Sequence, residues 1–249
     1  ELVNVNGTAN IITLAKQKHC TLSYVSTLSV SGDRLLSGGT ESAVFDEDCT
    51  DIGQNKDENV YVRSKFHAEE LVRKASSEGL DAKIFRVGRL VGRSTDGKFQ
   101  HDPGSNSFCK TVRGMLALGG IPKPVASMEI DLTAVDLCAR AIVILADSER
   151  QTFHIYNPNT VTSAEAIRAL RPDIPTVSDS EFRFTLFEAL SKACSPDLAL
   201  LTDAYNRIEK NGAQIVTKCE KTIEELEKAG FVWSKPDCAL LLQGFAADK

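Results

Sequence analysis

Residues 59–87 read NVYVRSKFHAEELVRKASSEGLDAKIFRV, and this stretch decides the fold class. Apolar residues recur at helical spacing over residues 59–77, which predicts an amphipathic helix, and Gly79 follows as its C-cap. Residues 82–87 (AKIFRV) are short and mostly apolar, which predicts a buried strand. A long helix followed closely by a short apolar strand is typical of a parallel α/β sheet.

The flanking sequence continues this alternation of helices and strands. Upstream, residues 6–19 predict a helix and residues 21–27 a strand, whereas residues 28–57 are rich in Gly, Ser, Asp and Asn and predict a loop. The elements expected downstream are a helix at 106–118, a strand at 127–132, a helix at 135–146 and a strand at 153–156. From residue 163 onward the pattern is mainly helical. The order of elements therefore predicts an α/β domain accompanied by a smaller, mostly helical lobe.

The composition is that of an ordinary soluble globular protein. The chain has 249 residues, of which 42% are apolar and 25% are charged, and its net charge is −5. These values argue against disorder, collagen and a disulfide scaffold. A mildly acidic chain has no general attraction to nucleic acid or to anionic lipid, and no apolar run approaches the roughly 18 residues of a membrane span. We therefore expect no nucleic-acid partner and no membrane partner.

Cysteines and histidines give no metal-site pattern. The seven cysteines are odd in number and widely spaced, which fits reduced thiols in a cytoplasmic protein. The four histidines form neither an HExxH motif nor a closely spaced ligand pair. The N-terminal residues have neither the basic nor the apolar region of a signal peptide. The expectation is a cytoplasmic chain without a structural or catalytic metal.

Tyr61 and Lys65 are the first candidates for chemistry. A spacing of four places both side chains on one face of the predicted helix, one turn apart. A free phenol has a pKa of about 10, and a nearby ammonium lowers that value by favouring the phenolate. Such a pair makes a usable general acid or base. Taken alone, an exposed helix with an incidental Tyr–Lys pair is the simpler explanation.

Three further stretches combine hydroxyl, amide or glycine residues with the ends of expected elements. Ser26 and Thr27 end a strand, where a hydroxyl can hold a substrate carbonyl oxygen or can satisfy a turn. Asn4 and Thr8 lie where a helix begins, and such residues are usually caps. Residues 85–92 (FRVGRLVG) run from a strand into glycines, which permit close approach to a ligand or form an ordinary turn.

Taken in this order, the four stretches resemble the extended short-chain dehydrogenase/reductase superfamily. Within it the sequence is most similar to the thioester reductase group, which includes the terminal reductase domains of nonribosomal peptide synthetases, carboxylic acid reductase domains and fatty acyl-CoA reductases. The stretches that carry the resemblance are YVSTLSVSG (24–32), YVRSKFHAEELV (61–72), FRVGRLVGRSTDG (85–97), LTAVDLCARAIVIL (132–145) and GFVWSKPDCALLLQGF (230–245). Val87 and Ala134 stand where proline is usual in the group.

The resemblance implies the fold and the division of the chain. It implies the C-terminal half of a doubly wound Rossmann-type parallel sheet plus a smaller, mostly helical substrate lobe. Residues 1–104, with a return near 128–158, would form a partial NAD(P)-binding Rossmann domain, and residues 105–127 and 159–249 the lobe. The family's Gly-rich GxxGxxG loop is nowhere in the sequence. We therefore expect a fragment of a longer reductase, and we expect this chain alone to be inactive.

The resemblance also implies an activity and its site. The expected reaction is NADPH-dependent reductive release of a carrier-bound acyl or peptidyl thioester as an aldehyde, with further reduction to an alcohol left open. Thr27 would bind the carbonyl oxygen, Tyr61 would donate a proton to it, and Lys65 would lower the pKa of Tyr61 and bind the nicotinamide ribose. Asn4 would support Lys65 through a backbone-bound water.

The remaining implications concern the cofactor, the partner and the alternatives. Val87 and Gly88 would lie against the nicotinamide, so that the cofactor-binding residues are Tyr61, Lys65, Val87 and Gly88. NADPH is the expected cofactor, with NADH left open, and the expected partner is a phosphopantetheinyl carrier protein domain. Two alternatives remain at this point: a sugar-nucleotide epimerase or dehydratase of the same superfamily, and a non-catalytic cofactor-sensing module.

Overall fold

The computed structural model describes residues 2–32, 35–36, 42–57, 59–192, 196–210 and 215–246. The chain divides into two compact units, each assembled from separate segments. Unit 1 comprises Glu1–Gly88, Cys138–Tyr156 and Asn211–Val232, and unit 2 comprises Arg89–Leu137, Asn157–Lys210 and Trp233–Lys249. Among the described helices, none is long and apolar enough to cross a membrane.

Unit 1 contains the longest strands of the chain. Its elements are η1 (Leu2–Asn6), α1 (Gly7–Lys18), β1 (Leu22–Thr27), η2 (Leu28–Ser31), β2 (Ala43–Phe45), α2 (Val60–Ser77), β3 (Ala82–Val87), most of α5 (Val135–Leu145), β8 (Thr152–Ile155), β11 (Ile215–Thr217) and α9 (Glu220–Lys228).

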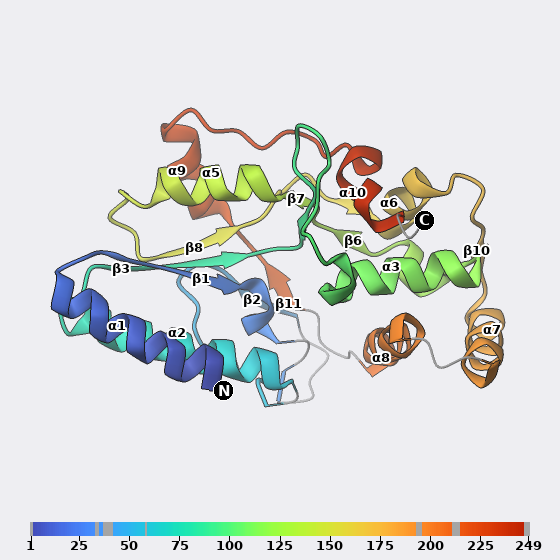
Figure 1. Ribbon diagram of the computed structural model, residues 1–249, viewed down its shortest axis with the longest axis horizontal. Coiled ribbons are helices and arrows are strands. Elements are labelled where there is room, and N and C mark those ends of the chain that lie inside the picture. Colours follow the sequence, from blue (N-terminus) through green and yellow to red (C-terminus); the bar gives the residue numbers. More distant parts are fainter. Residues whose placement is uncertain are drawn as a thin grey trace. The chain divides into compact units, whose positions relative to one another are not determined.

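The centre of unit 1 is a parallel sheet in the order β1-β3-β8. Leu22 pairs with Ala82 at one end of β1, and Thr27 pairs with Val87 at the other. Every residue of β3 is buried, because the strand has neighbours on both sides and helices over both faces. Figure 1 shows α1 and α2 on one face of this sheet and α5 and α9 on the other. The predicted α/β class is confirmed, and the strands predicted at residues 21–27 and 82–87 pair in parallel.

The segment 28–57, expected to be a loop, contains a strand. β2 pairs in parallel with β11, which comes from the distant segment at residues 215–217. Phe45 at the end of β2 is fully buried and stacks on His154, with 5.3 Å between the ring centroids. The loop prediction was therefore wrong for residues 43–45, because a three-residue strand with a partner so far along the chain leaves no local pattern.

Unit 2 is mostly helical, as expected for the lobe. Its elements are β4 (Leu90–Val91), η3 (Pro103–Ser105), α3 (Ser107–Leu118), β5 (Ile121–Pro122), α4 (Lys123–Ala126), β6 (Glu129–Ile130), β7 (Thr133–Ala134), β9 (Val161–Thr162), α6 (Ser163–Leu170), β10 (Thr176–Val177), α7 (Asp179–Lys192), α8 (Pro196–Lys210) and α10 (Cys238–Ala246). Its strands are short and pair two by two, as β4 with β7, β5 with β10 and β6 with β9.

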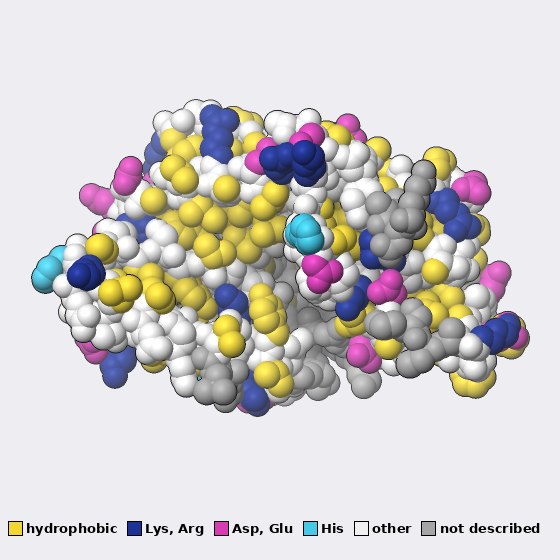
Figure 2. All heavy atoms as spheres, viewed as in Figure 1, with side chains coloured by type: hydrophobic (Ala, Val, Ile, Leu, Met, Phe, Trp, Pro, Cys, Tyr) yellow, Lys and Arg dark blue, Asp and Glu magenta, His cyan; other side chains and the backbone are white. Residues whose placement is uncertain are grey.

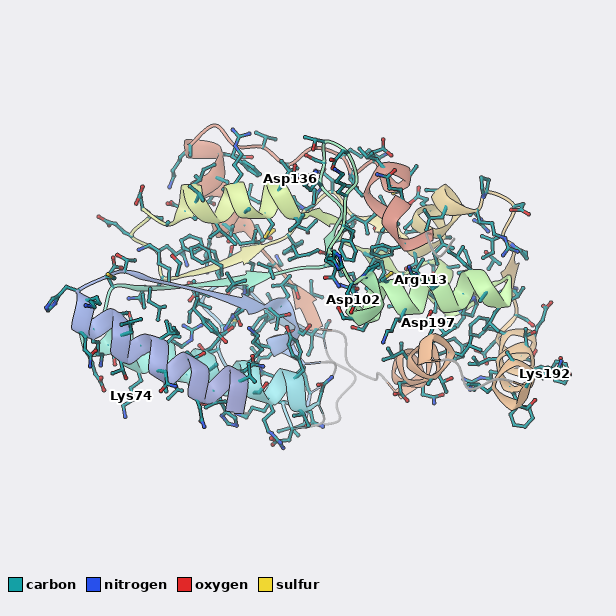
Figure 3. All side chains as sticks on the ribbon, viewed as in Figure 1. Lys74, Asp102, Arg113, Asp136, Lys192 and Asp197 are labelled. Atoms are coloured by element: carbon teal, nitrogen blue, oxygen red, sulfur yellow. The ribbon has the colours of Figure 1, made fainter. Side chains whose placement is uncertain are left out.

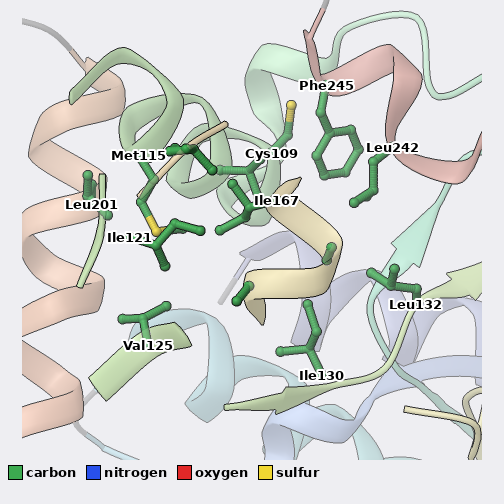
Figure 4. Packing of buried hydrophobic residues seen from close by; sticks show 14 of the residues in the cluster. Cys109, Met115, Ile121, Val125, Ile130, Leu132, Ile167, Leu201, Leu242 and Phe245 are labelled. Atoms are coloured by element: carbon green, nitrogen blue, oxygen red, sulfur yellow. The ribbon is translucent and has the colours of Figure 1, made fainter. Parts of the chain in front are cut away.

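A hydrophobic core holds helices of unit 2 together. Figure 4 shows residues of α3, α6, α8 and α10 meeting there, among them Met115, Ile167, Leu201 and Phe245. Phe245 makes ring contacts with Phe99 and Phe108 at centroid distances of 5.0 and 5.5 Å. The apolar faces of α3, α6, α8 and α10 are therefore buried against one another rather than against a large sheet.

The boundaries of the two compact units differ from the boundaries of the two expected domains. Residues 89–104 and 128–137 cluster with unit 2, because β4 pairs with β7. Residues 211–232 cluster with unit 1, because β11 pairs with β2. Short strands with distant partners decide both boundaries.

Asp136 fixes the start of α5 within unit 2. Its carboxylate accepts hydrogen bonds from the backbone N–H of Ser94 (2.8 Å) and from the Ser94 hydroxyl (2.7 Å). Figure 3 labels Asp136 on α5. Burial acts to raise the pKa of Asp136, but these hydrogen bonds outweigh it and lower the pKa. The carboxylate lies in the first turn of α5, where the positive end of the helix dipole also stabilises its negative charge.

Strand β1 is the edge of its sheet among the described residues. Val25 on this strand is 46% exposed, and Ile11 and Leu14 on α1 are half exposed. Figure 2 shows hydrophobic side chains gathered over the strands of this sheet, between α1 and α5. An apolar surface therefore borders the unpaired edge of β1.

Candidate active site

Tyr61 lies in the first turn of α2. Asn59 is the N-cap residue of this helix, and its side-chain oxygen accepts a hydrogen bond of 2.8 Å from the backbone N–H of Tyr61. The cap satisfies one of the unpaired donors at the helix start. The Tyr61 side chain is 49% exposed. Its phenol is therefore accessible while its backbone is fixed.

Lys65 follows one turn later and reaches the sheet. Its ammonium donates a hydrogen bond of 3.1 Å to the backbone carbonyl of Val25 and lies 5.1 Å from the ring centroid of Tyr24. Burial lowers the pKa of Lys65, and the negative charge of Glu69 opposes that effect. The ammonium is thus held against the last residues of β1, two positions before Thr27.

Thr27 ends β1 and is 9% exposed. Its hydroxyl accepts a hydrogen bond from the backbone N–H of Ser29 and donates one to the Ser29 hydroxyl, both at 3.2 Å. The turn interaction that we considered for this residue is therefore present. A hydroxyl held in this way keeps a fixed direction at the carboxyl end of the strand.

Asn4 supports α2 by a direct contact. It lies in the π-helical turn η1, and its side-chain amide donates a hydrogen bond of 2.9 Å to the hydroxyl of Ser64. The Ser64 hydroxyl in turn donates to the backbone carbonyl of Tyr61 at 2.9 Å. Thr8 does not cap α1, because its hydroxyl donates to the backbone carbonyl of Asn4 at 2.6 Å. Asn4 therefore holds α2 between Tyr61 and Lys65.

Val87 and Gly88 continue the carboxyl edge of the sheet. Val87 is the register partner of Thr27, and the backbone N–H of Gly88 donates to the carbonyl of Ile155 at 2.9 Å. Carboxyl ends of parallel strands are where α/β folds bind their ligands. The structure therefore brings Thr27, Val87 and Gly88 to one edge, with Lys65 hydrogen-bonded to the strand that carries Thr27.

A buried polar cluster lies one residue below this edge, and the sequence analysis missed it. The side chains of Glu69, Arg86 and His154 meet there and are almost inaccessible. Arg86 Nη2 lies 2.7 Å from Glu69 Oε2, and Arg86 Nη1 lies 3.2 Å from His154 Nε2. The sequence signal was an arginine near the end of the mostly apolar strand AKIFRV, since a buried arginine requires a partner.

The sequence of the chain is similar to an NAD-binding family and to a gramicidin synthase. An NAD-binding family described as male sterility protein matches residues 1–142. A linear gramicidin synthase of Brevibacillus parabrevis is 31% identical over 171 residues, which is 67% of this chain and 3% of that protein.

The fold is similar to solved reductase domains. The crystal structure of the aureusimine biosynthetic cluster reductase domain superposes with a TM-score of 0.86 and 27% identity, over 98% of this chain and 65% of that one. A thiolation-reductase di-domain from an archaeal nonribosomal peptide synthetase superposes with a TM-score of 0.79 and 27% identity, over 97% of this chain and 53% of that one. The chain thus spans less than two thirds of these proteins.

Proposed function

The chain belongs to the NAD-binding family described as male sterility protein, and from this premise we propose that it is part of a reductase that releases a carrier-bound acyl or peptidyl thioester as an aldehyde. Similarity to a linear gramicidin synthase, to the aureusimine reductase domain and to the thiolation-reductase di-domain supports this class of reaction. The observation that carries the proposal is the hydrogen bond between the Lys65 ammonium and the Val25 carbonyl. It anchors the Tyr–Lys helix to the strand that ends in Thr27.

The side chains at this edge fit the nicotinamide end of a dinucleotide. The Lys65 ammonium has three N–H donors, of which one is used on Val25, so that donors remain for ribose hydroxyls. Val87 and Gly88 offer a small apolar surface at the end of β3 for the flat face of a nicotinamide. We propose NADPH as the cofactor, bound by Tyr61, Lys65, Val87 and Gly88.

The proposed roles follow from the groups that each residue presents. The Thr27 oxygen keeps its hydrogen bond from the backbone N–H of Ser29, while its hydroxyl proton turns from the Ser29 hydroxyl to the thioester carbonyl oxygen and orients it. Bound NADPH supplies the hydride for the carbonyl carbon. Tyr61 donates its phenolic proton to the carbonyl oxygen as negative charge develops there, and the Lys65 ammonium stabilises the phenolate that remains. The hemithioacetal formed on the substrate then breaks its C–S bond, giving the aldehyde and the carrier thiol.

Within this proposal the partner is a carrier protein domain. The substrate arrives as a thioester on its phosphopantetheine arm, and the free thiol leaves with the carrier. Similarity to a protein in which a thiolation domain and a reductase domain are joined supports this partner.

The test is single-turnover oxidation of NADPH by the complete reductase domain that contains this chain, with a loaded carrier or an acyl-CoA as substrate. Tyr61→Phe removes the proposed proton donor and should lower the rate at least about 10²-fold. Tyr205→Phe is the matched control, because the Tyr205 hydroxyl donates to the Asp179 carboxylate within unit 2, whereas the proposed catalytic residues belong to unit 1. A Tyr61→Phe rate close to that of the control would refute the role of Tyr61.

A further inference from the structure

The carboxylate of Glu69 joins three elements of unit 1 at one point. From α2 it accepts a hydrogen bond of 2.5 Å from the Ser26 hydroxyl on β1. It also accepts hydrogen bonds of 2.7 to 3.1 Å from Arg86 on β3. Ser26 and Arg86 are register partners in the sheet. One side chain therefore fixes the distance between the helix and both strands.

This junction lies directly below the proposed catalytic groups. Ser26 and Arg86 each precede, by one residue, the register pair Thr27 and Val87. Along α2, Glu69 follows Lys65 by one turn, and residues four apart are neighbours on a helix surface. Movement of the carboxylate would shift the end of β1 and the Lys65 ammonium together.

From this geometry we infer that Glu69 is a positioning residue of the proposed reduction, which holds Lys65 and Thr27 in register and places a negative charge beside the Lys65 ammonium. The inference rests on the proposed function for its catalytic consequence. Its electrostatic part concerns this chain's own residues and can be tested without turnover.

The charged and polar groups that face Lys65 and Glu69 determine how strongly each of these two charges is stabilised. Lys65 faces the Tyr24 ring and the Val25 carbonyl from β1, and Glu69 from its own helix. Glu69 faces the Ser26 hydroxyl from β1, Arg86 from β3, and Arg73 on its own helix with 3.7 Å between the charged atoms. Behind Arg86 lie His154 on β8 and the backbone carbonyl of Cys49.

Glu69 thus supplies one negative charge close to the positive charges of Lys65, Arg73 and Arg86. Burial lowers the pKa of Lys65, and Glu69 is the charge that counteracts this effect. Without the carboxylate, desolvation would act on Lys65 unopposed, and the ammonium would lose its proton at lower pH. A purely structural role of Glu69 would not move this titration.

The experiment measures the protonation of Lys65 directly. Trace labelling with acetic anhydride across a pH series, read for each lysine by peptide mass spectrometry, gives the pH midpoint at which Lys65 becomes reactive. Glu69→Gln should move this midpoint down by about one pH unit, the scale of a nearby charge. Glu69→Asp keeps the charge and should leave the midpoint in place. Its shorter side chain cannot reach both Ser26 and Arg86, so kcat should still fall at least about tenfold, with a smaller change in the KM for substrate.

Two further variants protect the test. Glu70→Gln is the matched control, because Glu70 is exposed, pairs with His67 at 2.8 Å and should leave both midpoint and rate unchanged. Glu69→Gln leaves the buried charge of Arg86 without the Glu69 counter-charge and can unfold the protein. The double variant Glu69→Gln/Arg86→Met removes both charges and is expected to fold. It should lower the midpoint by less than Glu69→Gln alone, because loss of the Arg86 charge offsets part of the loss of the carboxylate.

The outcomes separate the two proposals. A lowered Lys65 midpoint in Glu69→Gln or in the double variant, unchanged in Glu70→Gln, supports the inference. An unchanged midpoint in the folded variants overturns it, whatever the activity. If the wild-type domain oxidises no NADPH with any thioester, the proposed function fails, and the labelling result still decides the electrostatic role of Glu69.

Discussion

His154 is a neutral imidazole in the core of unit 1. Its Nδ1 lies 2.7 Å from the backbone carbonyl of Lys218, which can only accept, so Nδ1 carries the proton. Its Nε2 is then free to accept from Arg86 Nη1 at 3.2 Å. Burial, with the positive charge of Arg86 as the next cause, lowers the pKa of His154 to about 3. The residue is therefore built into the core in its uncharged form.

Because His154 is buried in its neutral form, the unfolding free energy of the protein should fall as the pH is lowered. An unfolded histidine has a pKa of about 6.5, so below that pH protonation favours the unfolded chain. The contribution of neutral His154 is complete above about pH 6.5 and is lost as the pH falls toward 3. The difference in unfolding free energy between wild type and His154→Gln should shrink by about 1 kcal/mol per pH unit between pH 6 and 4. Urea unfolding across this range measures it.

The control for this prediction is His101→Gln, because the His101 side chain is exposed. A difference between wild type and His154→Gln that stays constant with pH would show that His154 is not held neutral.

At the scale of the element, two helices begin with the same residue in the same role. Asn59 caps α2 through the backbone N–H of Tyr61 at 2.8 Å, and Asn106 caps α3 through the backbone N–H of Cys109 at 2.9 Å. Either cap should contribute about 1 kcal/mol. Of the two caps, only Asn59 bonds to a residue with a proposed chemical role, which is Tyr61.

Asn59→Ala and Asn106→Ala should therefore separate stability from activity. Each is expected to lower the unfolding free energy by about 1 kcal/mol in urea titrations. Asn59→Ala should also reduce the single-turnover rate several-fold, because the first turn that carries Tyr61 loosens. Equal loss of rate in both variants would argue that the α2 cap has no special link to the site.

The sequence predicted these elements well where their signals are local. The helix at 59–77 and the strand at 82–87 agree with α2 and β3 to within one residue. The short strands β2 and β11 were missed because each is stabilised by a partner far along the chain. The same holds for the site: spacing identified Tyr61 and Lys65, whereas the roles of Ser64 and Glu69 depend on which strands and turns α2 packs against.

At the scale of the whole molecule, both units depend on the last segments of the chain. Unit 1 needs β11 as the partner of β2, and α9, whose Thr222 hydroxyl accepts from the backbone N–H of His154 at 2.9 Å. Unit 2 needs α10, because Leu241, Leu242 and Phe245 lie in its core. Neither unit is made from one continuous stretch.

Truncation should expose this dependence. A chain ending at residue 210 lacks parts of both units and should show no cooperative unfolding transition in urea. A chain ending at residue 232 retains every segment of unit 1 and should keep slow amide exchange in β3 while losing it in α3. Hydrogen exchange read by mass spectrometry measures both. Protection of β3 in the shorter chain equal to that in the full chain would contradict the prediction.

The late position of β11 and α10 also has a consequence during translation. A nascent chain emerges from the ribosome amino-terminus first. Strand β2 therefore has no partner until residues 215–217 emerge, and the core of unit 2 is incomplete until residues 241–245 emerge. During that interval the apolar faces of both units are open to chaperones and to other nascent chains. Translation that stops before residue 215 therefore yields a polypeptide in which neither core is complete. Such a polypeptide is expected to be bound by chaperones or degraded.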